Sequence, residues 1–180
     1  MSYVDHAGIA SLSRTQAACG RERFHWRRLV PDRTFLTAMG ESAPMKRFTF
    51  TVATDGNTDI VNLSPELAKY ISGIKGHALL HVFVGGSTAA ITTVEFEPGL
   101  IKHDMPEFFQ RLVPDNIHYD HEATWNDDNG HSHVRSALLG PGLTIPFADG
   151  KLMTGEYQQV VLVDFDTRPR KRVVIGTVLT

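Results

Sequence analysis

The chain has 180 residues, which is enough for one domain with a hydrophobic core and short for two. Its 42% hydrophobic and 21% charged content excludes a disordered chain, and the net charge of −2 favours no class of partner. The single cysteine, Cys19, excludes an intrachain disulfide, and the longest apolar runs are too short to span a membrane. With no apolar secretory signal near residue 1, we expect a cytoplasmic protein.

Residues 1–44 differ from the rest of the chain. They contain six arginines against four acidic residues and show no clear periodicity. A basic arm of this kind can contact nucleic acid or phosphate, but the arginines are diluted along the segment. We therefore predict a poorly ordered N-terminal extension, or a start of translation assigned too early, with Met45 as the alternative start. The domain itself is expected over 45–180, and nucleic acid is not an expected partner.

The first half of that domain predicts strands with one helix. Residues 47–53 alternate like a strand, and 55–57 read as a hairpin turn that leads to a returning strand at 59–63. Ser64 and Pro65 predict the cap and first position of a helix that ends at Gly73. Two strands follow at 78–84 and 89–96, joined by Gly85, Gly86, Ser87 and Thr88.

The second half predicts two more helices and three strands. A helix lies within 98–112, and a second helix at 132–139 ends at a Gly-Pro pair. The strands are expected at 143–147, 156–165 and 172–179, with 148–151 as a hairpin turn. Strands dominate and no strand–helix–strand alternation is sustained. The prediction is an α+β fold with a mostly antiparallel sheet or sandwich and two or three short helices.

The chemistry is expected in the segment 115–140, which is unusually long and polar for a loop of a compact domain. It carries His118, His121, His131 and His133 among aspartates and a glutamate, and these side chains bind divalent metals and transfer protons. On an extended chain the one-residue separation of His131 and His133 puts both rings on one side. His121 and Asp128 would then complete a site suited to zinc or another divalent ion. The alternative is a polar surface loop, because His, Asp and Asn also suit turns.

Two further groups of residues are candidates. Glu95 stands in an apolar strand, and Asp104 follows the next turn. The alternative for Asp104 is a role as a helix cap alone. The loop Gly86-Ser87-Thr88 offers backbone amides and hydroxyls to a phosphate, with Arg135 and Lys151 as sources of positive charge. It is not a Walker loop, and a glycine pair between strands is usually only a turn. No nucleophile elbow is present, which disfavours a covalent hydrolase.

Several blocks of sequence, in order, carry a resemblance to a known family. They are STAAITTVEFEPGL at 87–100, HDMPEFFQRLVP at 103–114, YDH at 119–121, DDNGHSHVRSALLGPGLTIPFADGKLMTG at 127–155 and YQQVVLVDFDTRPRKR at 157–172. From about residue 45 to 180 the chain resembles the YjbQ family, whose members are commonly described as secondary thiamine-phosphate synthases. The resemblance implies a small α+β subunit that forms a homotrimer, with sites at or near subunit interfaces.

The resemblance also implies which residues function. It places catalytic roles on Glu95, Asp104, His121, Asp128, His133 and Gln158, while His131 belongs to a subset of the family. Gly86, Ser87, Thr88 and Arg135 remain the candidates for holding phosphate, and His121, His131 and His133 for holding metal. The chain departs from the family pattern where many members have a histidine in place of Gly86, and where Glu156-Tyr157 replaces Thr-Trp.

The function expected from these residues is a transferase acting on small phosphorylated molecules, resembling thiamine-phosphate synthase, with magnesium or zinc as the possible metal and no organic cofactor. Such a reaction needs phosphate binding and neutralisation of a leaving group. Two alternatives stay open. One is a trimeric metal- or anion-binding protein without turnover, and the other is a metal-dependent hydrolase.

Overall fold

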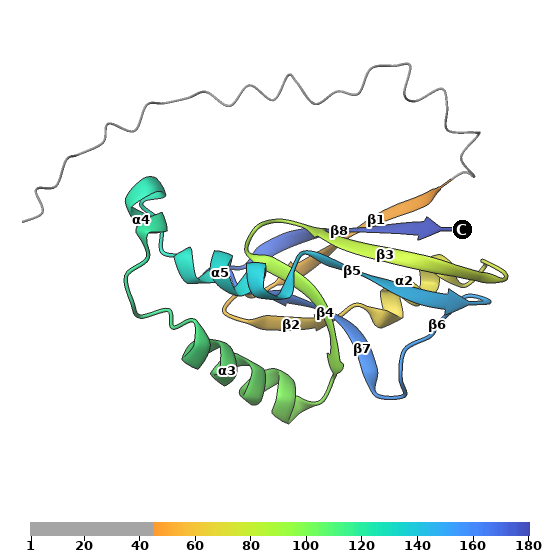
Figure 1. Ribbon diagram of the computed structural model, residues 1–180, viewed down its shortest axis with the longest axis horizontal. Helices are drawn as coiled ribbons and strands as arrows, with labels where there is room; N and C mark the ends of the chain where they lie inside the picture. Colours follow the sequence, from red (N-terminus) through yellow and green to blue (C-terminus); the bar gives the residue numbers. More distant parts are fainter. Residues whose placement is uncertain (1–44) are drawn as a thin grey trace, which may run out of the picture. The chain divides into compact units, whose positions relative to one another are not determined.

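The computed structural model describes residues 45–180, and the predictions made for residues 1–44 lie outside them. This part of the chain forms two antiparallel sheets and four α-helices (Figure 1). The strands are β1 (Lys46–Thr54), β2 (Asp59–Asn62), β3 (His77–Gly85), β4 (Ala89–Glu95), β5 (Gly142–Ala148), β6 (Lys151–Leu152), β7 (Gln158–Asp164) and β8 (Arg170–Leu179). The helices are α2 (Ser64–Ile71), α3 (Met105–Leu112), α4 (Asp120–Trp125) and α5 (Gly130–Leu139), and a π-helical turn, η2 (Leu100–Asp104), precedes α3.

The predicted α+β class with antiparallel sheets is confirmed. One sheet has the strand order β1-β8-β3-β5-β6 and the other β2-β7-β4. The homotrimer stays a prediction. The helix count exceeds the expected two or three because α4 lies within the segment predicted as a loop, and its six residues are too few to show an apolar period.

Two hydrophobic cores lie on the two faces of the three-stranded sheet. Val160 and Leu162 of β7 face the larger core, which is shared with the five-stranded sheet and α2. Val161 and Val163 face the smaller core, which includes Phe109 of α3. The alternation along β7 therefore buries both of its faces, as expected for a strand between two packed layers. Phe109 of α3 and Leu139 of α5 both contribute to the smaller core, so these two helices lie on that face of the three-stranded sheet (Figure 1).

The predicted hairpin at 55–57 is wrong. β1 pairs with β8 along its whole length, whereas β2 pairs with β7 in the other sheet. Gly56 has a φ of +79°, and a Cβ there would lie 2.5 Å from the Asp166 carbonyl oxygen. The turn thus packs against the end of β7 and carries the chain from one sheet to the other. The hairpin predicted at 148–151 is confirmed, with positive φ at Asp149 and Gly150.

The helix caps predicted from the sequence at Ser64 and Asp104 are not formed. Ser64 does not cap α2; its hydroxyl instead accepts a hydrogen bond from the Val160 amide across to β7. Asp104 precedes α3 without a side-chain capping bond, because η2 already continues the helix upstream. Among the described residues no helix is long and apolar enough to cross a membrane.

Candidate functional site

The predicted metal site built on His131 and His133 assumed an extended chain, and that assumption is wrong. Both residues lie in α5, where a separation of two residues turns side chains by about 200° around the helix axis. His133 faces His121 of α4, with ring centroids 4.4 Å apart. His131 faces the other way, toward Tyr119, with ring centroids 6.1 Å apart. The structure therefore brings together two of the three predicted metal ligands.

His121 and His133 form the centre of the candidate site with Asp127. The Asp127 Oδ1 atom lies 3.5 Å from His121 Nε2, and both atoms are buried without a hydrogen-bond partner. Buried polar atoms are nearly always paired, so an unpaired imidazole facing an unpaired carboxylate marks a place where something else can bind. Sequence reasoning favoured the neighbouring Asp128 and missed Asp127.

Burial, followed by the adjacent His121, lowers the pKa of His133, which keeps its ring neutral at pH 7. A backbone hydrogen bond with Ser87, the middle residue of the Gly86-Ser87-Thr88 loop, acts in the opposite direction. Ser87 thus lies beside the histidine pair. The histidines come from α4 and α5, and the loop comes from between β3 and β4.

A buried ionic network holds the Thr88 end of this loop. The Thr88 hydroxyl donates to Asp166, and Arg172 donates to both the Thr88 hydroxyl and Asp164. Although burial disfavours its charge, hydrogen bonds from Arg170 and Thr88 keep the pKa of Asp166 below the usual value. Asp166 is therefore an anion, and its charge acts to raise the pKa of His133. The signal in the sequence was a pair of aspartates at 164 and 166 followed by the basic run 168–172.

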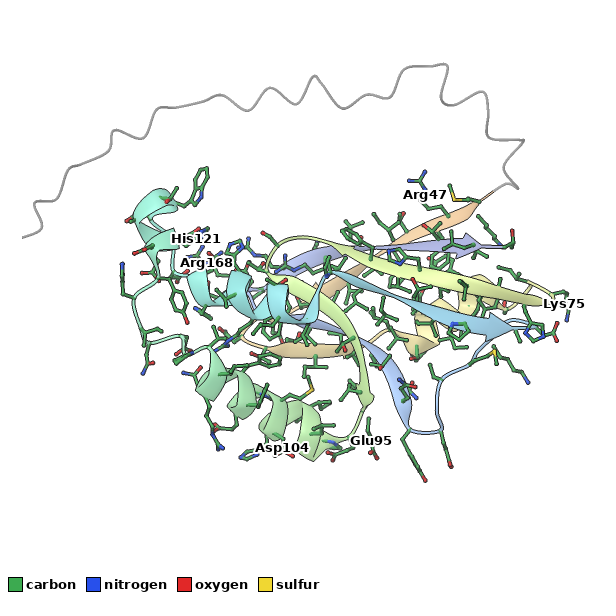
Figure 2. The ribbon with its side chains drawn as sticks, in the orientation of Figure 1. Arg47, Lys75, Glu95, Asp104, His121 and Arg168 are labelled. Carbon is green, nitrogen blue, oxygen red and sulfur yellow. The ribbon has the colours of Figure 1, made fainter. Side chains whose placement is uncertain are left out.

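Asp128 lies at the edge of the site. Its Oδ1 atom accepts hydrogen bonds from the Thr167 hydroxyl at 2.9 Å and from Arg168 at 3.1 Å. Arg168 is exposed and lies at the same end of the domain as His121 (Figure 2). This arginine, which sequence reasoning did not select, supplies a cation next to the candidate site.

Arg135 does not join the glycine loop. Its guanidinium donates to the Val113 carbonyl, Gln110 and Thr58, on the face of α5 that also carries His131. The residue spacing explains this, because positions 131 and 135 are one helical turn apart. Lys151 is exposed at the start of β6.

The remaining predicted residues lie at the opposite end of β4. Glu95 is exposed and pairs in register with Gln158, whose amide donates to the Thr93 hydroxyl. Asp104 is exposed and contacts His103 at 2.9 Å. Figure 2 shows Glu95 and Asp104 together, far from His121. β4 alone spans about 20 Å between Ala89 and Glu95, so within one chain the predicted residues form two separate groups.

Comparison with known families decides the identity of the fold. A model of the UPF0047 protein YjbQ-like family matches residues 48–180. The chain belongs to the YjbQ family. The YjbQ protein of Escherichia coli O157:H7 is 35% identical over 99 residues, covering 55% of this chain and 71% of that protein. A UPF0047 protein of Archaeoglobus fulgidus is 29% identical over 125 residues, covering 69% and 95%.

Solved structures of other proteins share the fold. A protein of unknown function from Sulfolobus solfataricus superposes with a TM-score of 0.66 at 26% identity, covering 76% of this chain and 99% of that one. A hypothetical protein from Aeropyrum pernix gives a TM-score of 0.67 at 29% identity, covering 74% and 98%. These likenesses support the assignment of family and fold and carry no statement of activity.

The glycine at position 86 has a structural reason in this chain. A Cβ at Gly86 would lie 2.9 Å from Arg172 Nη1, and that guanidinium is held by Asp164 and Thr88. We expect Gly86→Ala to lower the free energy of unfolding by about 1–3 kcal/mol, as overpacking does. Urea denaturation measures this. The matched control Gly73→Ala has open space around its Cβ and should cause no loss; equal losses in both variants would contradict the explanation.

The two histidines of α5, His131 buried and His133 half-buried, also predict how stability depends on pH. Burial is the main cause that lowers the pKa of both His131 and His133 in the folded protein. The unfolded chain therefore binds more protons than the folded chain just below the ordinary value of 6.5, and stability must fall as pH decreases through that value. Urea denaturation at pH 7.5 and 5.0 should show a lower midpoint at pH 5.0. An unchanged or higher midpoint would contradict the burial of these rings as neutral groups.

Proposed function

We propose that this YjbQ protein is an enzyme acting on small phosphorylated molecules at the His121–His133 pair. The observation that carries the proposal is the contact of two imidazoles next to an unpaired carboxylate, beside the Ser87 loop. A neutral imidazole donates a hydrogen bond from one nitrogen and accepts at the other, so it can hold a phosphate oxygen and exchange a proton with it. Arg168 adds positive charge at the edge.

The reaction proposed is thiamine-phosphate formation from a pyrimidine pyrophosphate and a thiazole phosphate. In it, the thiazole nitrogen forms a bond to the pyrimidine methylene carbon, and the bond from that carbon to the pyrophosphate oxygen breaks. The residues required are those that hold the leaving pyrophosphate and stabilise its developing charge. The histidine pair and Arg168 have the hydrogen-bond donors for this role. Glu95, Asp104 and Gln158 lie too far away to assist within the same chain.

The test is an assay of purified full-length protein with magnesium and the two precursors, in which thiamine phosphate is quantified by its fluorescent oxidised form. We expect product that increases linearly with enzyme concentration. No product above the enzyme-free reaction would reject this reaction. Release of inorganic phosphate from model phosphate esters would then support the metal-dependent hydrolase.

A second candidate function is divalent metal binding, which the facing pair of His121 Nε2 and Asp127 Oδ1 favours. Imidazole nitrogen and carboxylate oxygen are zinc ligands, and His133 would provide a third. Within residues 45–180, however, no three His, Cys, Asp or Glu side chains converge in a geometry that could hold a metal ion. The donor types fit zinc, whereas their present positions do not.

A zinc titration measured by isothermal titration calorimetry tests this metal site. If the cluster closes around zinc, we expect about one ion per chain in the wild type and none in His121→Gln. The exposed His118 gives the control variant His118→Gln, which should keep the ion. Equal zinc binding by all three proteins, or none by the wild type, would reject this metal site.

A further inference from the structure

A polar cavity lies on the face of α5 that points away from His133. Its volume is about 220 Å³, and its walls come from the β1–β2 turn, α3, the segment after α3 and α5. The lining is polar and includes Thr58, Gln110, Asp115, His131 and Arg135. The proposed phosphate site uses none of these residues.

Arg135 is the most informative residue of this cavity. Its side chain is only 4% exposed, although arginine is almost never fully buried without a partner of opposite charge. Within residues 45–180 no carboxylate oxygen lies within 4.0 Å of its guanidinium. Its charge persists despite burial, which lowers its pKa, because a guanidinium does not deprotonate in proteins. The cavity therefore has a buried cation without a direct counter-ion.

The hydrogen bonds of Arg135 leave one side of the guanidinium available. Nε and Nη2 both donate to the Val113 carbonyl, and Nη2 also donates to Gln110 at 2.8 Å. Nη1 has only a long contact of 3.4 Å with the Thr58 hydroxyl. Nη1 has two hydrogens, so at least one remains for a ligand.

His131 provides a second, independent observation. It lines the same cavity, is 4% exposed, and its Nδ1 atom is buried without a partner. Burial, followed by the charge of Arg135, lowers its pKa, so the ring is neutral. A neutral imidazole one helical turn from an incompletely bonded guanidinium makes a pair of donors for one planar oxyanion.

The acidic side chains that line the cavity favour a singly charged anion over a doubly charged one. Asp115 accepts a hydrogen bond from Gln110, which in turn accepts from Arg135, so a carboxylate already lies two contacts away. Glu107 also lines the cavity. These acids repel a dianionic phosphate more than a singly charged carboxylate. We propose that this cavity binds the carboxylate group of a small molecule through Arg135 and His131.

Backbone amide NMR of the full-length protein tests the proposal, with acetate and glycine as carboxylate probes, inorganic phosphate as the competing anion and chloride to hold ionic strength constant. We expect saturable shifts at residues 131–135 with acetate or glycine. Arg135→Met should raise the dissociation constant for acetate and glycine at least tenfold, and the isosteric His131→Phe should raise it about three- to tenfold. Arg47→Met, an exposed arginine at the start of β1, should leave it unchanged (Figure 2).

The outcomes decide between the alternatives. Because Arg135 also holds the Val113 carbonyl, Arg135→Met may not fold, and His131→Phe then carries the test. No saturable shift with either carboxylate would overturn the proposal, as would the same shifts with chloride. Saturable binding of phosphate alone, or carboxylate binding that neither variant weakens, would also overturn it.

Discussion

Replacing Asp164 with asparagine is expected to lower the free energy of unfolding by about 3–5 kcal/mol. Asp164 is fully buried, and its two oxygens accept hydrogen bonds at 2.6 Å from Nε and Nη2 of Arg172. Thr54 donates to the same carboxylate. The amide cannot neutralise Arg172, which is only 8% exposed. The buried guanidinium would then depend on the more distant carboxylate of Asp166, 3.5 Å from Nη2, which Arg170 shares.

Two controls separate burial of charge from loss of a contact. The double variant Asp164→Leu/Arg172→Met removes both charges and should be more stable than Asp164→Asn, because removing a whole buried ion pair is often close to neutral. Asp128→Asn breaks a solvent-exposed pair with Arg168 and should cost less than about 1 kcal/mol. Chemical denaturation measures all three. A loss below 1 kcal/mol in Asp164→Asn would show that the network is not a structural ion pair.

The second large effect is expected on turnover. His133→Gln should reduce the rate of thiamine-phosphate formation by about 10²- to 10³-fold, the usual consequence of removing one donor that stabilises developing negative charge. Glutamine keeps a polar side chain but loses the ring that contacts His121 and can exchange a proton. The folded state should be retained, since His133 is only partly buried.

His118→Gln is the matched control for this effect. His118 lies in the same histidine-rich segment, but its side chain is 71% exposed, and its ring nitrogens lie near the carboxylates of Asp120 and Glu122. Its turnover should stay within about threefold of the wild type, since exposed residues away from a site rarely matter. Equal losses in both variants, or none in His133→Gln, would remove His133 from the reaction.

Strand positions could be predicted from the sequence because alternation of apolar residues is local. Strand partners could not. The turn at 55–57 has the composition of a hairpin, yet β1 and β2 belong to different sheets. That outcome depends on the packing of Gly56 against the Asp166 carbonyl, which follows β7 and lies far along the sequence from Gly56. Contacts over such separations leave no mark in a local pattern.

The candidate site was located in the right segment but with the wrong geometry. The distinction between a helix and an extended chain at 130–133 decides whether His131 and His133 share a face, and the sequence was compatible with either. Once α5 is helical, His133 joins His121, and His131 joins Arg135. The histidine-rich segment thus serves two separate places, where one metal centre was predicted.

The functional residues implied by the family resemblance also form two groups that are separated in the structure. His121, Asp128 and His133 lie at one end of the domain, and Glu95, Asp104 and Gln158 at the other (Figure 2). A second copy of the chain could unite them only if the predicted trimer places these ends together. Within one chain, Asp127 is the carboxylate that contacts His121, and the charges of Asp127 and Asp166 both act on His133.

The central claim is that His121 and His133 together bind a phosphate group. Imidazole ¹⁵N NMR of the wild-type protein, titrated with inorganic phosphate at constant ionic strength, tests it most directly. We predict saturable shifts of the His121 and His133 signals, while the exposed His77, His103 and His118 stay unchanged. Unchanged signals from the pair, or equal shifts of every histidine, would contradict the claim.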